Sequence, residues 1–336
     1  MSFIYLYFTL KQHFGNMTLI TDIPPAHIQQ ELLALRASVR ETVPPKRLGQ
    51  NLLIATWNIR AFGNITRKWT SEEGDSPRRD LHSVRSIAEI IRHFDVIALQ
   101  EVKDNIRGLR DLMEILGRDW SLILTDVNRG DAGNGERMAY LFDTRRVQLS
   151  GLACELVVPD DVLNVSEDAL SKQFARTPYA VGFRTMNTTF VLVTLHILYG
   201  NKSKDRIPEL RAIAKWLADW AKRVNSYEQN FIALGDFNID KRGDLLEKTF
   251  VAEGLHIPEG LLGHSRSIFD ETKYYDHITW FDGENNIPRL SMTFQKGGNF
   301  DFIDKVFLDQ GLSKQQISWM ISDHYPLWAE FELPEE

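Results

Sequence analysis

The chain has 336 residues, of which 43% are hydrophobic and 25% are charged, a composition typical of a globular protein that can bury a core. Its formal net charge is −7, from 39 basic and 46 acidic side chains. Bulk positive charge is therefore excluded as the means of holding nucleic acid, and any such contact needs a local basic patch with modest, salt-sensitive affinity. The single cysteine, Cys154, excludes an intrachain disulfide and is consistent with a reducing compartment.

The N-terminal segment Met1–Leu10 is apolar and aromatic, but it has no basic stretch, no small-residue cleavage site and too few residues to span a bilayer. We therefore expect no signal peptide, no membrane anchor and a cytoplasmic location. Met17 is an alternative start, because little before it is typical of folded structure. A helical period over residues 26–41 and a polar linker divide the chain into an N-terminal extension with one helix, residues 1–50, and one domain, residues 51–336.

Apolar runs alternate with amphipathic periods along this domain, which predicts strands interleaved with helices and an α/β fold. Strands are expected at residues 52–60, 95–101, 120–124, 136–142, 180–184, 189–196, 274–280 and 327–333. Helices are expected at residues 81–94, 107–116, 206–224 and 245–253. Several of these strands end in polar residues, and active sites of α/β proteins gather where strand ends and loops meet.

One further stretch, Phe231–Asn238, has four apolar residues, a glycine, and then Asp236 and Asn238 two positions apart. An apolar run that ends at Gly235 predicts a buried strand reaching its edge. If the extended backbone continues, Asp236 and Asn238 point the same way and can hold a metal-bound phosphate or an attacking water. An Asx-rich turn is the alternative. An EF-hand calcium loop is disfavoured, because Lys241 occupies its glycine position and a strand precedes it.

The polar residues at the other strand ends suit the same kind of reaction as Asp236 and Asn238, attack of water on a metal-bound phosphate. They are Asn58, Glu101, Glu136, His196, Asp276, Asp323 and His324. Carboxylate and amide oxygens suit a hard cation such as Mg²⁺, which stabilises charge on a phosphoryl oxygen. One histidine can take a proton from the attacking water and the other can protonate the leaving oxygen, with Glu136 and Asp276 available to orient them. Asp304 is a rival of Asp276, since it also lies in a strand-like segment. No zinc-type ligand cluster and no G-x-S-x-G motif occur.

The loop over residues 65–80 carries a basic cluster, Arg67, Lys68, Arg78 and Arg79. Such clusters are usually solvated surface, and contact with a polyanion is the alternative. Charge reversal in this loop distinguishes the two, because only a polyanion contact changes the salt dependence of binding.

The ordered motifs T-W-N-I-R, L-Q-E, G-E-R-x-x-Y-L-F, A-R-T-P, T-L-H, L-G-D-F-N, Y-D-H-I and S-D-H-Y-P resemble those of the endonuclease/exonuclease/phosphatase superfamily, and most of all its deoxyribonuclease I-like branch. The resemblance extends from about Leu52 to Phe331. It implies a four-layered α/β sandwich, in which two mostly antiparallel β-sheets are flanked by helices. His196 and Glu136 separate the chain from the abasic-site repair branch, but not from sphingomyelinase-like or deadenylase-like branches. Secreted deoxyribonucleases carry disulfides and a signal peptide, which this sequence does not show.

The resemblance also implies a role for each matching residue. The metal ion, Mg²⁺ with Mn²⁺ or Ca²⁺ as substitutes, is assigned Asn58, Glu101 and Asp323, and the substrate phosphate is assigned Asn58 and Arg176. The catalytic groups are two histidines with their orienting acids and a pair that holds water and phosphate: Glu136 with His196, Asp276 with His324, and Asp236 with Asn238. The implied activity is metal-dependent cleavage of phosphodiester bonds by in-line attack of water, as in a DNA endonuclease, with DNA as the partner. The alternatives are a phosphatase or phosphodiesterase acting on RNA or on a small or lipid phosphate ester, and a catalytically dead binding module.

Overall fold

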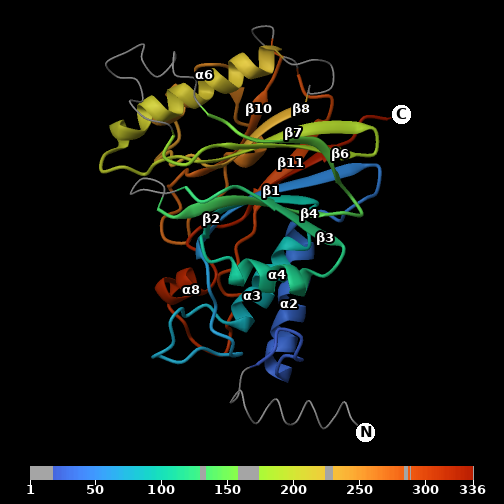
Figure 1. Cartoon of the computed structure of the whole chain (residues 1–336), viewed down its shortest axis with the longest axis vertical. Coiled ribbons are helices and arrows are strands. Elements are labelled where there is room, and N and C mark those ends of the chain that lie inside the picture. Colours follow the sequence, from blue (N-terminus) through green and yellow to red (C-terminus); the bar gives the residue numbers. More distant parts are fainter. Residues whose placement is uncertain are drawn as a thin grey trace.

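In the computed structural model, which describes residues 18–128, 134–157, 174–223, 230–283, 287 and 289–335, two six-stranded sheets pack face to face. Helices cover both outer faces, so that the layers run helix, sheet, sheet, helix (Figure 1). The helices α2, α3, α4 and α8 lie against the first sheet, and α6 lies against the second (Figure 1). This arrangement confirms the predicted α/β sandwich.

The sheets have a similar construction. The first consists, in spatial order, of β11 (Thr293–Asn299), β12 (Leu327–Glu332), β1 (Asn51–Phe62), β2 (Val96–Lys103), β4 (Glu136–Asp143) and β3 (Trp120–Leu124). The second consists of β5 (Gln148–Glu155), β6 (Tyr179–Thr185), β7 (Thr188–His196), β8 (Asn230–Asp236), β10 (Asp276–Phe281) and β9 (Leu255–His256). The helices are α2 (Ala26–Thr42), α3 (Leu81–Ile91), α4 (Arg107–Leu116), α6 (Ile207–Arg223), α7 (Leu245–Val251) and α8 (Lys314–Met320), with short 3₁₀ turns η1 (Ser203–Arg206) and η2 (Glu259–Leu261).

The central pair of each sheet is parallel, β1 with β2 and β7 with β8, whereas the other pairs in the described residues are antiparallel. Parallel neighbours need a crossover connection, which α3 supplies in the first sheet and α6 supplies in the second. Both strands of a parallel pair end at the same edge of their sheet. Polar residues near the C-terminal ends of β1 and β2 therefore lie side by side, as do those at the C-terminal ends of β7 and β8.

Both faces of the central strands are buried, which explains their nearly continuous apolar sequence. In β1, Leu52 and Ile54 belong to the apolar layer between the two sheets. The alternate residues Leu53, Ala55 and Trp57 belong to the layer between the first sheet and its helices. The two-residue period of a strand therefore supplies two different cores from one apolar run.

The helix expected at residues 26–41 is α2, and it packs on the helical layer of the first sheet. Val39 is fully buried in the same apolar cluster as the core of α3. Nε of Arg36 lies 2.8 Å from Oε2 of Glu89, and Nε2 of His82 lies 2.6 Å from Oε1 of Glu31, so an ion pair and a histidine–carboxylate contact join α2 to α3.

Among the strands and α-helices, four have no counterpart among those expected from the sequence: β5, β9, β11 and α8. The strands β5, β9 and β11 lie at sheet edges. The side chains of β5 and β11 are mostly exposed or half-buried and β9 has only two residues, so no apolar run marks them. The short helix α8 did leave a signal, because Ser313 and Gln316 form a capping box at its N-terminus.

The basic loop at residues 65–80 is largely neutralised by its own surroundings. Arg67 pairs with Asp111 at 2.6 Å and Lys68 pairs with Asp75 at 2.9 Å. Arg79 is 3% exposed, and its guanidinium donates to the backbone carbonyl oxygens of Arg60, Ala61, Met320 and Ile321. These contacts account for Arg67, Lys68 and Arg79, whereas Arg78 is half-buried and donates to the carbonyl oxygen of Glu72. Contact of this loop with a polyanion stays a prediction.

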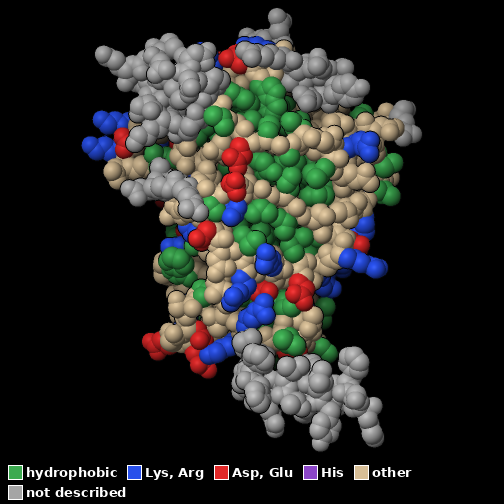
Figure 2. Space-filling view, in the orientation of Figure 1, with side chains coloured by type: hydrophobic (Ala, Val, Ile, Leu, Met, Phe, Trp, Pro, Cys, Tyr) green, Lys and Arg blue, Asp and Glu red, His purple; other side chains and the backbone are tan. Residues whose placement is uncertain are grey.

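The molecular face drawn in Figure 2 carries Lys and Arg side chains interspersed with Asp and Glu, around hydrophobic and uncharged surface. None of the described helices is both long and apolar enough to cross a bilayer.

Candidate active site

The predicted site residues meet at the edge where the central strands of both sheets end. Asn58 and Glu101 lie on β1 and β2, whereas His196 and Asp236 are the last residues of β7 and β8. The side chain of Asn58 joins the two sheets, because its Nδ2 donates to Oδ2 of Asp236 at 2.9 Å and to Oε1 of Glu101 at 3.1 Å. The sandwich thus brings into direct contact residues that the chain separates by 178 positions.

The close approach of β7 and β8 at this edge depends on Gly235. Its φ of 142° is one that residues with a side chain rarely adopt, and a Cβ there would overlap the backbone carbonyl of Leu195. The next pair of facing residues is His196 and Asp236. Any larger residue at position 235 would therefore push the strands apart beside the site.

The site converges on one atom, Oδ2 of Asp236. Nε2 of His196 lies 3.6 Å from it and Nε2 of His324 lies 4.0 Å from it. Burial alone would raise the pKa of Asp236, but the two imidazoles and the hydrogen bond from Asn58 outweigh burial, and the pKa lies below its usual range. The buried carboxylate therefore stays ionised at neutral pH.

His324 is held by Asp276, the first residue of β10. Nδ1 of His324 lies 2.7 Å from Oδ2 of Asp276, which is fully buried. Burial would lower the pKa of His324, but Asp276 and Asp236 raise it well above its ordinary value. Burial likewise raises the pKa of Asp276. The rival acid, Asp304, lies in an exposed turn with a φ of 61°, so the geometry favours Asp276.

His196 lies beside Glu136, the first residue of β4. Nδ1 of His196 is 3.4 Å from Oε2 of Glu136, which is an ion-pair distance longer than a good hydrogen bond. The same carboxylate accepts hydrogen bonds from Nε of Arg176 at 2.6 Å and from Nζ of Lys103 at 2.9 Å. Burial would raise the pKa of Glu136, but His196, Arg176 and Lys103 together hold it far below its usual range.

Four buried polar atoms of the site have no hydrogen-bond partner within the described residues. They are Oδ1 of Asn58, Nη1 of Arg176, Nδ1 of His196 and Oδ1 of Asp276. Buried polar groups nearly always have partners, so a cluster of orphans indicates a site built around a ligand. The free Nη1–H of Arg176 suits a phosphate oxygen.

The backbone turns sharply at three positions around the site. Glu101, Asn238 and Ala61 have φ values of 60°, 51° and 46°, in the left-handed region that residues with a side chain seldom occupy. The N–H of Ala61 donates to Oε2 of Glu101 at 2.9 Å, which fixes the carboxylate. Strain of this kind tends to gather at functional sites.

The extended backbone that was expected to continue from Asp236 through Asn238 is not present. The strand ends at Asp236, and the left-handed backbone of Asn238 breaks the alternation on which the expectation was based. The backbone N–H of Asn238 donates to Oδ1 of Asp236 at 2.9 Å, so the Asx turn is also present. Nδ2 of Asn238 donates to the carbonyl oxygen of Ile197 at 2.7 Å, which still places the amide beside His196.

Asp323 is more exposed than its neighbours in the site. Its Oδ2 lies 3.6 Å from Nη1 of Arg60, and 29% of its side chain is exposed. The guanidinium of Arg60 lies over the ring of Trp319 on α8, 3.8 Å from the ring centroid. Sequence reasoning did not single out this stacked arginine.

The residues present fit an oxygen-preferring cation that keeps most of its water. Oε1 of Glu101 accepts a hydrogen bond from Nδ2 of Asn58 at 3.1 Å, and Oδ1 of the same amide has no hydrogen-bond partner within the described residues. Magnesium is typically bound by one or two carboxylates and several waters. Within the described ranges no group of three or more His, Cys, Asp and Glu side chains is placed to hold a metal, which argues against a closed protein cage.

Sequence reasoning also missed Glu209, which supports the site from α6. Oε1 of Glu209 accepts the backbone N–H of Ala175 at 3.2 Å, and Oε2 accepts that of Leu198 at 2.9 Å. The acid therefore fixes the backbone next to Arg176 and two residues after His196. Its only signal in the sequence is an acid one turn before Ile213, on the apolar face of the helix.

The model of the endonuclease/exonuclease/phosphatase family matches residues 55–324, and the chain belongs to this family. Members of the family are hydrolases that include nucleases and phosphatases. A deoxyribonuclease of Thioalkalivibrio sp. (strain K90mix) is 28% identical over 298 residues, which are 84% of this chain and 71% of that protein. Deoxyribonuclease gamma of Homo sapiens is 25% identical over 195 residues, which are 55% of each chain.

Two solved structures show the same fold at low sequence identity. A mannosyl-6-phosphatase of Bacteroides thetaiotaomicron has a TM-score of 0.54 at 18% identity, covering 83% of this chain and 99% of that one. The TDP2 protein of D. rerio, complexed with a single strand DNA product, has a TM-score of 0.53 at 14% identity, covering 84% and 98%. These likenesses bear on the fold alone.

Proposed function

We propose that the chain is a metal-dependent phosphodiesterase that cleaves DNA by in-line attack of water on phosphorus. One observation carries the proposal: two imidazoles, each beside a buried carboxylate, approach the same oxygen of Asp236. Such an arrangement suits a reaction in which one proton is removed from water and another is supplied to a leaving oxygen. The deoxyribonuclease relatives favour DNA as the substrate.

In this proposal the anionic carboxylate of Asp236 holds the attacking water between the imidazoles. His196, oriented by Glu136, accepts the proton of that water. His324 has a pKa raised by Asp276 and Asp236 against the effect of burial, so it is protonated at neutral pH and donates to the leaving oxygen.

The substrate phosphate is held by two side chains that each have an N–H group free to donate a hydrogen bond. Arg176 gives one N–H to Glu136 and has a free Nη1. The amide of Asn238 uses one N–H on Ile197 and has a second for a phosphate oxygen. Both lie beside His196, so the phosphate they hold faces the proposed proton acceptor.

The proposed cation is Mg²⁺, with Mn²⁺ or Ca²⁺ as substitutes, held by Glu101, Asn58 and Asp323. When bound, it supplies positive charge that stabilises the negative charge developing on phosphoryl oxygens. The protein orients Glu101 for this purpose through the N–H of Ala61 and the amide of Asn58.

The test uses supercoiled plasmid, single-stranded DNA, RNA and bis(4-nitrophenyl) phosphate, each with Mg²⁺ and with EDTA. We expect plasmid nicking only with metal, and a loss of about 10²- to 10⁴-fold in His196→Ala and in His324→Ala. His27→Ala is the matched control, because His27 is half exposed on α2 and remote in sequence from the site. Retained Mg²⁺-dependent nicking by His324→Ala would refute the proposal.

The same assay separates the alternatives. Cleavage of RNA or of the small diester without cleavage of DNA would indicate a phosphatase or phosphodiesterase for other substrates. No activity on any phosphate ester with Mg²⁺ or Mn²⁺ would indicate a binding module.

A further inference from the structure

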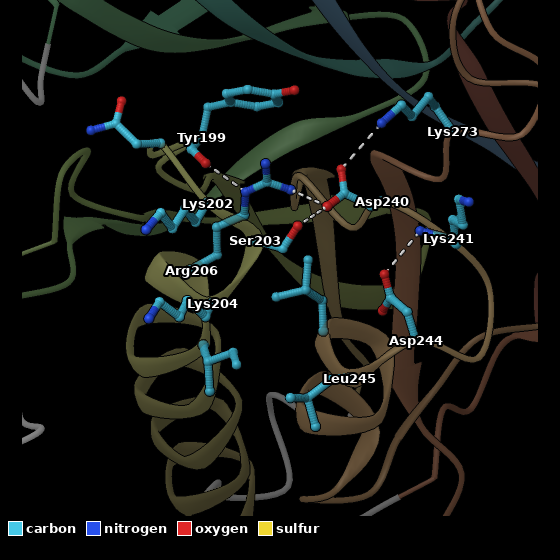
Figure 3. Close-up of a pocket in the computed structure, with 13 residues that line it drawn as sticks. Tyr199, Lys202, Ser203, Lys204, Arg206, Asp240, Lys241, Asp244, Leu245 and Lys273 are labelled. Carbon is cyan, nitrogen blue, oxygen red and sulfur yellow. Dashed lines mark hydrogen bonds and ion pairs between the residues drawn. The ribbon is translucent and has the colours of Figure 1, made fainter.

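A pocket lies next to the candidate active site, and none of the residues assigned to the chemistry lines it. It has a volume of about 690 Å³. Its walls are η1 and the start of α6 on one side, and the loop after β8 with the start of α7 on the other (Figure 3). We call it the lysine pocket, from the cationic side chains that line it: Lys202, Lys204, Arg206, Lys241 and Lys273.

The lysine pocket is positive although the chain as a whole is negative. Its five cations face two carboxylates, Asp240 and Asp244, which gives a local charge of +3 in a chain of net charge −7. On the face drawn in Figure 2, by contrast, the two signs of charge are interspersed. A concentration of one sign in a concave site attracts ligands of the opposite sign.

The two carboxylates are already engaged. Asp240 lies 3.0 Å from Nη1 of Arg206 and 3.3 Å from Nζ of Lys273 (Figure 3). Asp244 caps α7 by accepting the backbone N–H of Glu247 at 2.9 Å, and it also accepts that of Lys241 at 3.0 Å.

The ammonium groups of Lys202, Lys204 and Lys241 remain without an ion pair among the described residues. Asp205, on the same turn as two of these lysines, directs its carboxylate to the backbone N–H groups of Asn201 and Lys202. Three flexible cations are thus available to a ligand.

Hydrogen bonds and ring contacts connect the lysine pocket to the active site. Arg206 is 3% exposed, and its guanidinium donates to the carbonyl oxygens of Asn238 and Tyr199, each at 2.6 Å. The rings of Tyr199 and Tyr275 lie 6.5 Å apart, and the rings of Tyr275 and His324 lie 5.5 Å apart. A row of aromatic rings therefore leads from the proposed proton donor to the rim of the pocket.

We propose that the lysine pocket binds backbone phosphates of a polynucleotide strand that flank the phosphate being cleaved. This inference rests on the proposed function and adds a second contact site for its polynucleotide substrate. A small phosphate ester has one phosphate and occupies the reaction site alone, whereas a polynucleotide carries a charge at every nucleotide and reaches both sites. Lysines act as compact point charges on flexible stems, so they hold phosphates without reading bases. Tyr199, 53% exposed at the rim, offers a face on which a base can stack.

The test compares two triple variants with the same change in net charge. The pocket variant is Lys202→Glu/Lys204→Glu/Lys241→Glu. The control is Lys215→Glu/Lys222→Glu/Lys296→Glu, whose lysines are exposed on α6 and β11 and do not line the pocket. Values of kcat/KM are measured on a DNA oligonucleotide and on bis(4-nitrophenyl) phosphate between about 50 and 200 mM salt, with thermal melting to check folding.

We expect the pocket variant to lose about tenfold or more in kcat/KM on DNA, mainly through KM, because three phosphate contacts are removed. The dependence of log kcat/KM on log salt should become shallower by about 0.7 to 0.9 for each lost contact. The ratio of activity on DNA to activity on the small diester should fall, while the control keeps the wild-type ratio and slope.

Equal ratios and slopes in the two triple variants would overturn the inference and leave the proposed function intact. A wild-type protein that cleaves only the small diester would instead overturn the proposed function. If the pocket variant does not fold, Lys202→Ala/Lys204→Ala/Lys241→Ala provides the same comparison without charge reversal, and an unchanged salt slope in it would likewise overturn the inference.

Discussion

Replacing Asp276 by Asn tests the pairing of acid and histidine more directly than any other single change. The substitution keeps the shape of the side chain and removes its charge. Asp276 is fully buried, and its Oδ2 lies 2.7 Å from Nδ1 of His324. The variant therefore leaves the imidazole in place with a neutral partner.

The size of the effect follows from this contact. A hydrogen bond to a charged group contributes about 1.5–3 kcal/mol, which corresponds to a factor of about 10 to 150 in rate. Burial lowers the pKa of His324, and the negative charge of Asp276 is the main effect that raises it. Without that charge the pKa falls, so less of the imidazole is protonated at neutral pH. We expect kcat to fall by about 10²- to 10⁴-fold, the range for loss of an oriented general acid.

The assay is the pH profile of kcat for plasmid nicking with Mg²⁺. A proton donor with a raised pKa is active below that pKa and loses activity as pH rises through it. Because the pKa of His324 falls in the variant, the basic limb of the profile should move to lower pH. A purely structural role of Asp276 would lower activity without moving this limb.

Asp304→Asn is the matched control. Asp304 lies in an exposed turn at a φ of 61°, a conformation that Asn tolerates well. It should retain wild-type activity and the wild-type profile. Full activity in Asp276→Asn, or its loss in Asp304→Asn, would show that the acid is wrongly assigned.

Three further substitutions test the close packing of β7 and β8, the backbone contacts of Glu209, and Glu101 as a metal ligand. Gly235→Ala should lower the free energy of unfolding by at least about 4 kcal/mol in urea denaturation, because its Cβ overlaps the carbonyl of Leu195; Gly243→Ala, which meets no atom within 4 Å, should cost only about 1 kcal/mol. Glu209→Gln should cost about 1–3 kcal/mol, since an amide offers one acceptor oxygen to two backbone N–H groups, and an unchanged Tm would contradict this. Glu101→Gln should raise the Mg²⁺ concentration for half-maximal cleavage by about tenfold or more, and an unaltered metal dependence would exclude Glu101 as a ligand.

Most of the helices and strands, and most of the side chains that meet at the site, could be predicted from the sequence. The spacing of apolar residues along a short segment indicates which of its side chains are buried. For this reason β3 and α4 could be predicted with their observed bounds. The polar residues at strand ends could be chosen as site residues because they interrupt those runs. Edge strands such as β5 escaped prediction, because only one face or none is buried and no periodic signal remains.

Which of these residues contact one another could not be predicted without the folded structure. The choice of Asp276 over Asp304, the bridge from Asn58 to Asp236, and the support from Glu209 depend on strand register and on how the two sheets stack. The lysine pocket likewise joins η1, the loop after β8 and the segment before β10. Contacts of this kind link positions far apart along the chain, and local periodicity carries no information about them because it records the burial of a residue and not the identity of its neighbours.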